Sequence, residues 1–332
     1  MALLPIIYMG GQLGLESTPG TSVAANKQLL SLGFSRLNPK SAGGAVFRGQ
    51  GNKLGSLVVP PGKQWSEVSF EGYITFNEIV YILCSAIKNV SPSADGTNGK
   101  KWLFNYALNA ADAKATYTYE NGNATRAQKA TYAHVSALKL EMSKEMSKVS
   151  GTMLAQKRQD GITITASPTQ IAPSIVAPLK YDVYIATTQA GLAGASVFPL
   201  PLGVTLDIPK ISDVLFRMNS SDASFFGSVE QPIEPVLTLR CGSDASDYAN
   251  FLALIDSGAA QWIRVKATGA TIAGAMASQE LFQIDFCGGL IEPESRGEEN
   301  GAATNEFQFR GLYDTTAGYM FQTTATNTLA TL

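Results

Sequence analysis

Hydrophobic and polar residues alternate most regularly in residues 131–142, where Leu138 and Leu140 interleave with Lys139 and Glu141. Successive side chains of a β-strand point to opposite faces, so this pattern predicts a strand with one buried face and one wet face. Similar patterns predict strands in residues 65–71, 101–108, 114–120 and 146–157, with a hairpin turn at residues 143–145.

A different spacing begins after Gly72 and indicates a helix. Thr75 and Glu78 stand three residues apart, as in a capping box, in which side chains satisfy free backbone N–H groups. Apolar residues then recur at intervals of three and four, so we expect a helix that ends before Pro92 and buries one face. The apolar residues of that face are Phe76, Ile79, Val80, Leu83 and Ile87.

The N-terminal region has no strong periodicity. Residues 10–44 are rich in Gly, Ser, Thr and Asn, which predicts an extended arm or an ordered loop, and we expect it to contact a neighbouring subunit. The first ten residues lack a basic region and are interrupted by Pro5, so they fit neither a signal peptide nor a membrane span. No later segment has 18 uninterrupted apolar residues, so no membrane span is expected.

The second half of the chain repeats features of the first. Residues 54–57 resemble residues 226–229, and Trp102 and Trp262 each stand on the first strand expected after a helix. The similarity matches residues 131–142 with 306–313 and residues 146–157 with 319–328. A second helix, opening at Ser243 or Asp244, would bury Tyr248, Phe251, Leu252 and Ile255. The offsets vary, so a shared β architecture without common descent also explains the similarity.

Length and composition favour two domains in a multi-subunit assembly. A chain of 332 residues suggests two domains at about 150 residues each, and the Pro-rich passage at 167–179 is a stiff connection between them. Only 16% of residues are charged, which suggests that neighbouring molecules cover much of the surface. The net charge of −2 argues against strong binding of nucleic acid.

Residues that carry enzyme or metal chemistry are scarce. The one histidine, His134, lies in an alternating strand pattern, where a structural role is favoured over catalysis. The three cysteines form no C-x-x-C pair and are expected to be reduced core residues. The glycine-rich segments at 49–55 and 95–100 lack the full spacing of nucleotide-binding or calcium-binding loops. We therefore expect no enzyme activity, no metal and no cofactor.

Two charged segments are the candidate contacts between subunits. One is the predicted hairpin around residues 139–148, and the other is the acidic segment around Pro293, which also fits a solvated loop. The candidate residues are Lys139, Glu141, Lys144, Glu145, Lys148, Glu292, Glu294 and Arg296.

Three passages carry a resemblance to a known family. The first is residues 71–83, EGYITFNEIVYIL, with an Asn-Glu helix opening, followed by the aromatic strand at 101–104. The second runs from residues 117–122 through 132–140, and the third is residues 311–329. Together these passages resemble the major tail tube proteins of long-tailed bacteriophages.

The resemblance implies a mainly β fold of two tandem tail-tube-like domains. Each would be a β-sandwich or partial barrel of antiparallel sheets flanked by one α-helix, and strands of adjacent domains would join into a continuous barrel. The expected layout is an N-terminal arm at 1–45, domains at 46–166 and 180–332, and the Pro-rich linker at 167–179.

The resemblance also implies a structural role in a virion. Single-domain relatives form hexameric rings, so a two-domain chain is expected to form trimers with pseudo-sixfold symmetry, stacked into a hollow conduit for genome delivery into the host. Expected partners are further copies of the chain and the tape measure, tail terminator and baseplate or tip proteins. DNA would pass through the lumen without specific binding. The expected location is the phage tail, after synthesis in the bacterial cytoplasm.

Two other classes remain open. A tube protein of the type VI secretion kind shares the ring fold but is usually a compact single domain. A β-sandwich adhesin or carbohydrate-binding module needs exposed aromatic rings, whereas Trp65, Trp102 and Trp262 lie within strand patterns.

Overall fold

The structure, a computed structural model, describes residues 10–42, 51, 53, 62–218, 222–243, 251, 254, 256–274, 276, 278–291 and 295–332. Within these residues the protein is mainly β, as predicted, with large and mostly antiparallel sheets and one complete α-helix, α1 (Ile79–Ala86). Two 3-10 helices, η2 (Pro178–Lys180) and η3 (Ala190–Ala193), flank the strand β13 (Tyr181–Ala186).

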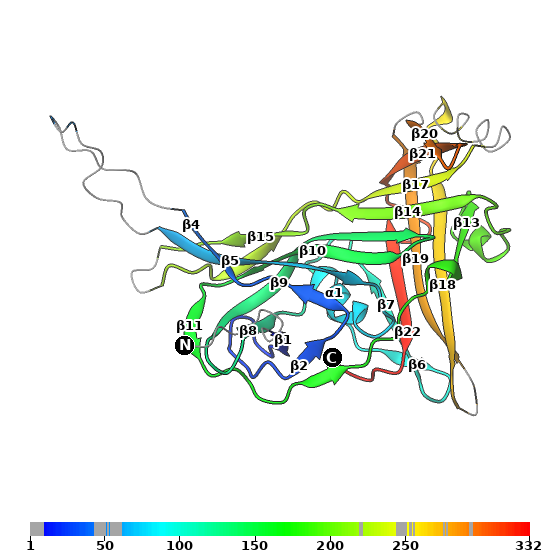
Figure 1. Ribbon diagram of the computed structural model, residues 1–332. Coiled ribbons are helices and arrows are strands. Elements are labelled where there is room, and N and C mark those ends of the chain that lie inside the picture. Colours follow the sequence, from blue (N-terminus) through cyan, green and yellow to red (C-terminus); the bar gives the residue numbers. More distant parts are fainter. Residues whose placement is uncertain are drawn as a thin grey trace.

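The largest sheet takes strands from both halves of the chain, and we call it the shared sheet. Its strands are β3 (Leu32–Phe34), β4 (Asn38–Ala42), β5 (Lys63–Tyr73), β10 (Ser147–Ala155), β9 (Ala127–Ser143), β14 (Pro201–Ile208), β17 (Val236–Gly242), β21 (Ala302–Gly311) and β20 (Ser295–Glu299). The order is β5, β10, β9, β14, β17, β21, with β3 and β4 on β5 at one end and β20 on β21 at the other. In Figure 1, β5, β10, β9 and β14 run from left to right.

A second sheet stands upright at the right of Figure 1 and crosses the direction of the shared sheet. Its strands are β6 (Ser93–Asp95), β7 (Gly99–Asn105), β22 (Phe321–Asn327), β19 (Ser278–Leu290), β18 (Gln261–Ile272) and β13, in that order. The last residues of β19 pair with β21, so β19 connects the two sheets. Strands from the two halves of the chain also pair in this sheet, because β7 lies beside β22.

A third sheet packs the N-terminal residues against the first half. Its strands are β1 (Gly10–Leu15), β2 (Lys27–Leu29), β8 (Tyr117–Gly122), β11 (Gln159–Ile162), β12 (Thr169–Ile171) and the first part of β9. Residues 127–133 of β9 pair with β8, and residues 134–142 pair with β10. Tyr132 has a φ of 56° close to this change of partner. The long strand predicted from alternation is therefore present, but it belongs to two sheets.

A separate hairpin of β15 (Ser212–Leu215) and β16 (Gly227–Glu230) lies beside the start of β5. The N–H of Gln64 donates to the carbonyl of Ala223 at 2.9 Å, and Trp65 packs edge-on against Phe216. In Figure 1, β15 extends to the left together with β4 and β5.

Helix α1 begins at Ile79, after a turn at residues 76–78 that follows the predicted cap at Thr75, and its burial also differs from the prediction. All eight of its residues are buried, including Tyr81 and Ser85, so it has no exposed face. The Ser85 hydroxyl accepts a hydrogen bond from the N–H of Val135 on β9, at 3.0 Å. The expectation of one buried face is therefore wrong, because the helix lies inside the main hydrophobic core and is apolar on nearly every side.

The segments expected to form the N-terminal arm and the interdomain linker contain strands that pair with other parts of the chain. Residues 10–42 form β1 to β4 instead of an arm, and their Leu13, Leu29 and Leu37 are buried in the protein's own core. The Pro-rich passage contains β12, which runs parallel to β2. Strand pairing between β9 and β14 and between β7 and β22 crosses the expected boundary between the domains.

The second predicted helix lies partly outside the described residues, which omit 244–250. Phe251, Leu254 and Asp256 are helical, and the buried ring of Phe251 stacks on Phe307 with centroids 4.2 Å apart.

Strand pairing relates the two halves differently from the sequence match. β10 pairs with β5 and β21 pairs with β17, so β10 corresponds to β21, whereas the sequence match paired β10 with the region of β22.

Candidate functional site

The side of the shared sheet that faces away from the core is polar, and we call it the polar face. Cross-strand register places Lys139 opposite Asp207 and Glu141 opposite Lys148. Opposite charges at facing positions stabilise a sheet by roughly 0.2–1 kcal/mol. Lys148 also lies 3.4 Å from Glu71, and Lys139 lies 2.5 Å from Glu141, whose carboxylate raises the lysine pKa through a hydrogen bond. The structure thus brings three of the candidate residues into one charge-matched cluster.

The same pattern continues into the second half of the chain. Arg240 of β17 faces Glu306 of β21, and Thr238 faces Gln308 beside them. Thr205 of β14, the first strand of the second half at this junction, lies opposite Glu141 on one side and Thr238 on the other. Charged pairs and small polar residues therefore alternate along the polar face.

The tip of the β9–β10 hairpin contacts the second half of its own chain. Lys144 forms an ion pair with Glu299, which also lies 3.1 Å from Arg240. The hydrogen bond from Lys144, followed by the nearby charges of Lys144 and Arg240, lowers the pKa of Glu299. The neighbouring candidate Glu145 is exposed at the turn.

The second candidate segment is described only in part. Arg296 is exposed on β20, whereas Glu292 and Glu294 lie outside the described residues. The sequence interpretation did not assign Arg240 a role, although residues 236–242 alternate regularly between buried and half-buried positions. That alternation was the signal that identified Lys139 and Glu141.

Strands β10 and β21 occupy matching positions in the two halves. β10 lies between β5 and β9, and β21 lies between β17 and β20. β4 covers the outer edge of β5, as β14 covers that of β17. The outer edge of β9 is covered by β14, but among the described residues no strand covers the matching edge of β20 or the outer edge of β4. In the part of the chain that the structure describes, the shared sheet therefore has two open edges of complementary type.

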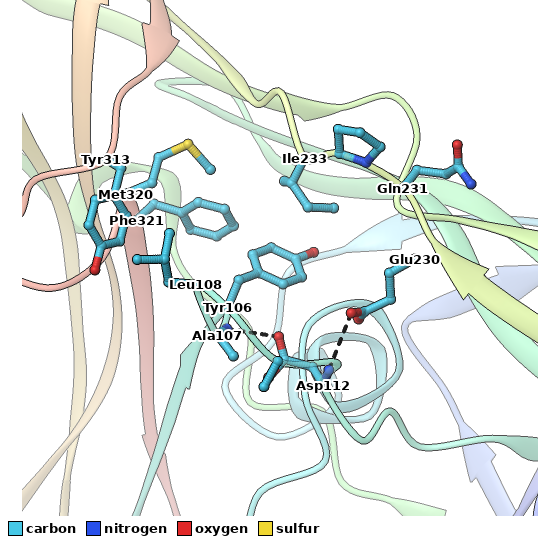
Figure 2. Close-up of a pocket in the computed structure, with 12 residues that line it drawn as sticks. Tyr106, Ala107, Leu108, Asp112, Glu230, Gln231, Ile233, Tyr313, Met320 and Phe321 are labelled. Carbon is cyan, nitrogen blue, oxygen red and sulfur yellow. Dashed lines mark hydrogen bonds between the residues drawn. The ribbon is translucent and has the colours of Figure 1, made fainter.

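A cavity of about 370 Å³ lies between the halves, at the ends of β7, β16 and β22 (Figure 2). Lysines neutralise both of its acids, because Lys88 lies 3.5 Å from Asp112 and Lys114 lies 2.9 Å from Glu230. Burial raises the pKa of the Tyr106 hydroxyl well above its usual value. The ion pair between Lys114 and Glu230 joins the two halves of the chain. Apolar lining residues include Leu108, Ile233, Tyr313, Met320 and Phe321.

The remaining reactive side chains lie in packed surroundings. His134 is buried against the rings of Tyr132 and Phe225, and burial lowers its pKa to about 4. The three cysteines are buried and free, and burial raises the pKa of Cys84 to about 12 and that of Cys287 to about 11. These environments favour packing roles, because neither thiol reaches the thiolate form near neutral pH.

None of the helices in the described residues has the length and apolar character needed to span a bilayer, and no three His, Cys, Asp or Glu side chains of these residues gather as metal ligands.

No family model matches the chain, and no curated protein is significantly similar to it.

Proposed function

We propose that this chain is a structural subunit of a bacteriophage tail tube, which assembles with copies of itself into rings that stack around a lumen. The observation that carries the proposal is the junction between β9 and β14. Six residue pairs, from Gly203 opposite Ser143 to Ile208 opposite Leu138, join strands from the two halves into one sheet.

The same junction can be repeated between copies. β4 occupies the position of β14, and β20 occupies that of the end of β9, so β4 of one copy fits beside β20 of the next. Such a contact joins two different surfaces, and contacts of this type produce closed rings or helical filaments. It also covers two edges that would otherwise invite uncontrolled pairing.

The polar face suits the inner wall of such a ring. Lys139, Lys148 and Arg240 each have a carboxylate on a facing or adjacent position, which limits their attraction for DNA phosphates. Tight phosphate binding requires cations that are free to replace counterions. A wall of paired charges lets DNA move past it.

Disulfide trapping tests the junction directly. Ser41 on β4 and Arg296 on β20 are exposed and lie on the two strands that this contact would bring together. The native cysteines are buried, so new surface cysteines react selectively. We expect the Ser41→Cys, Arg296→Cys variant to form a reducible ladder that ends at a closed trimer. The control variant, Ser41→Cys with Asp182→Cys on β13, should give no such ladder.

Electron microscopy of concentrated protein provides the second test. Rings or hollow tubes with six-lobed end views are expected. The proposal is contradicted if the concentrated protein stays monomeric and the Ser41→Cys, Arg296→Cys variant never cross-links. That result would favour a binding module. For carbohydrate binding, however, Trp102 and Trp262 are buried and offer no ring to a sugar.

A further inference from the structure

Asparagine is followed by glycine at three places in the chain: Asn98–Gly99, Asn121–Gly122 and Asn300–Gly301. Glycine has no side chain to shield its backbone nitrogen, so this nitrogen can attack the side-chain amide of the preceding asparagine. The attack requires the backbone between the two residues to rotate. Strand pairing and close packing oppose that rotation, and the three pairs differ in both.

Strand pairing on both sides holds the pair at Asn121. This residue is buried in β8, which pairs with β1 and with β9. Its amide donates a hydrogen bond of 3.2 Å to the carbonyl of Gly10. A Cβ on Gly122 would lie 2.3 Å from the carbonyl oxygen of Arg126, so the backbone here has no room to rotate.

A contact between two turns holds the pair at Asn98. Its side chain is exposed, but its amide donates a hydrogen bond of 2.6 Å to the carbonyl of Ala273, between β18 and β19. Gly99 begins β7 and pairs with Asp95 of β6. A Cβ on Gly99 would lie 2.2 Å from both the carbonyl oxygen of Asp95 and the hydroxyl oxygen of Ser278. This pair is therefore also confined.

The pair at Asn300 forms the turn between β20 and β21 and lies in open surroundings. Asn300 is exposed, and its side-chain amide forms no hydrogen bond among the residues that the structure describes. No atom lies within 4 Å of the position of a Cβ on Gly301. The φ values of 53° and 81° are those of Asn-Gly in a two-residue hairpin turn. Such a turn can open without moving packed neighbours.

We propose that Asn300 is a site of spontaneous deamidation, which the fold selects from the three Asn-Gly pairs. The backbone nitrogen of Gly301 loses its proton and bonds to the side-chain carbonyl carbon of Asn300, and the amide nitrogen leaves as ammonia. Water then opens the succinimide ring at one of its two carbonyls, which leaves aspartate or isoaspartate. Water is the co-reactant, and the reaction does not depend on tube assembly.

Isoaspartate at this turn would loosen a contact between the two halves of the chain. Glu299 pairs with Ala302 across the turn and forms ion pairs with Lys144 and Arg240. Isoaspartate carries the main chain through the former side chain and lengthens it, whereas a two-residue turn needs a fixed backbone geometry. We therefore expect the pairing at the turn to be lost, together with the ion pair to Lys144.

Peptide mapping of folded protein, aged in a mildly alkaline buffer, tests the proposal. Trypsin cleaves after Lys and Arg and so separates the three pairs into residues 89–100, 115–126 and 297–310. Mass spectrometry follows the amide-to-acid mass shift of each peptide with time, and fragment ions distinguish Asn300 from Asn305.

The relative rates decide the outcome. Asn300 should convert at least about tenfold faster than Asn98 and Asn121, because reaction at those two sites requires local opening of paired strands. In guanidinium chloride the three rates should become similar. Equal rates in the folded protein overturn the proposal. So does an excess at Asn300 that persists in guanidinium chloride, because local sequence would then select the site.

Amide hydrogen exchange of residues 297–310 tests the effect on the turn. Aged protein should exchange there at least about threefold faster than fresh protein. Asn300→Asp adds the charge without lengthening the main chain and should exchange at the fresh rate. Asn300→Gly keeps a residue suited to positive φ and removes the amide, so ageing should leave its exchange unchanged. Equal exchange in aged and fresh wild type overturns the loss of pairing.

Discussion

The indole N–H of Trp102 on β7 donates a hydrogen bond of 3.1 Å to the side-chain oxygen of Asn327, which lies 225 residues later. Asn327 is fully buried at the end of β22. Its amide also donates to the carbonyl of Phe76 at 2.7 Å and accepts from the N–H of Leu329 at 2.9 Å. One side chain thus fastens the last strand to the first half of the molecule.

Replacing this amide should therefore destabilise the whole fold. Asn327→Ala leaves the Trp102 N–H, the Phe76 carbonyl and the Leu329 N–H without their partner, and we expect a loss of about 3 kcal/mol in the free energy of unfolding. Urea denaturation monitored by tryptophan fluorescence measures it. The adjacent exposed position gives the control, because Thr328→Ala should change stability by less than about 0.5 kcal/mol. Equal effects of the two variants would contradict this account.

His134 should make the protein sensitive to mild acid. Burial, followed by the nearby charge of Lys114, lowers its folded pKa to about 4, while the unfolded value is 6.5. The unfolded chain therefore binds the additional proton first, and this contribution to stability is lost as the pH falls from 6.5 towards 4. The shift corresponds to a loss of about 3 kcal/mol.

Comparing the pH dependence of the free energy of unfolding in wild type and a His134 variant separates the effect of the histidine from that of the carboxylates. His134→Phe keeps a ring between Tyr132 and Phe225, and its free energy of unfolding should fall less steeply than that of wild type between pH 6.5 and 4. Parallel profiles for the two proteins would show that His134 does not titrate on unfolding.

Glu78 should respond to pH in the opposite direction. Its carboxylate accepts hydrogen bonds from the backbone N–H groups of Leu30 and Ser31 and from the Thr75 hydroxyl, yet burial outweighs them and raises its pKa above 4.5. A folded pKa above the unfolded value means that this group destabilises the fold as the pH rises through that interval. The contribution of Glu78 to stability therefore becomes more favourable as the pH falls.

Removing the Glu78 carboxylate should nevertheless be costly, because it leaves three donors unpaired. We expect Glu78→Ala to lower the free energy of unfolding by about 2–4 kcal/mol at pH 7. Glu145→Ala, in the exposed hairpin turn, should change it by less than about 0.5 kcal/mol. Chemical denaturation of both variants makes the comparison, and a small effect at Glu78 would contradict the assigned contacts.

Gly151 on β10 should tolerate no side chain. A Cβ there would lie 2.3 Å from the carbonyl oxygen of Ala137 and 2.6 Å from the ring of Phe70. We expect Gly151→Ala to cost about 2 kcal/mol, because backbone on the neighbouring strand must move. Gly203→Ala on β14 is the matched control, since its nearest contact would be an ordinary 3.5 Å. Melting temperatures of the two variants should therefore separate clearly.

Local patterns in the sequence predicted local structure well. The Thr75 hydroxyl accepts from the N–H of Glu78, as the capping spacing predicts, and the hairpin turn lies where residues 143–145 placed it. The Glu78 side chain, however, bonds to Leu30 and Ser31 rather than to the N–H of Thr75. This contact joins residues far apart in sequence, so local spacing carries no signal for it.

Partner choice between strands could not be predicted in the same way. Alternation shows which residues of β9 face the core, but it does not identify β14 as the neighbour or reveal the change of sheet near Tyr132. For the same reason the sequence pointed to Lys139 and Glu141 but not to the cavity that three arginines help to line. Arg36, Arg126 and Arg158 come from three segments that only the folded chain brings together.

The pairing of β7 with β22 also determines when the molecule can be completed during translation. At about 5–20 residues per second, a ribosome needs roughly 10–45 s to add the 225 residues between Trp102 and Asn327. Throughout that interval the nascent first half exposes the edge of β7 that β22 later covers. The fold of the first half can therefore be completed only after β22 has been synthesised. A truncated chain released before residue 321 lacks the strand that pairs with β7.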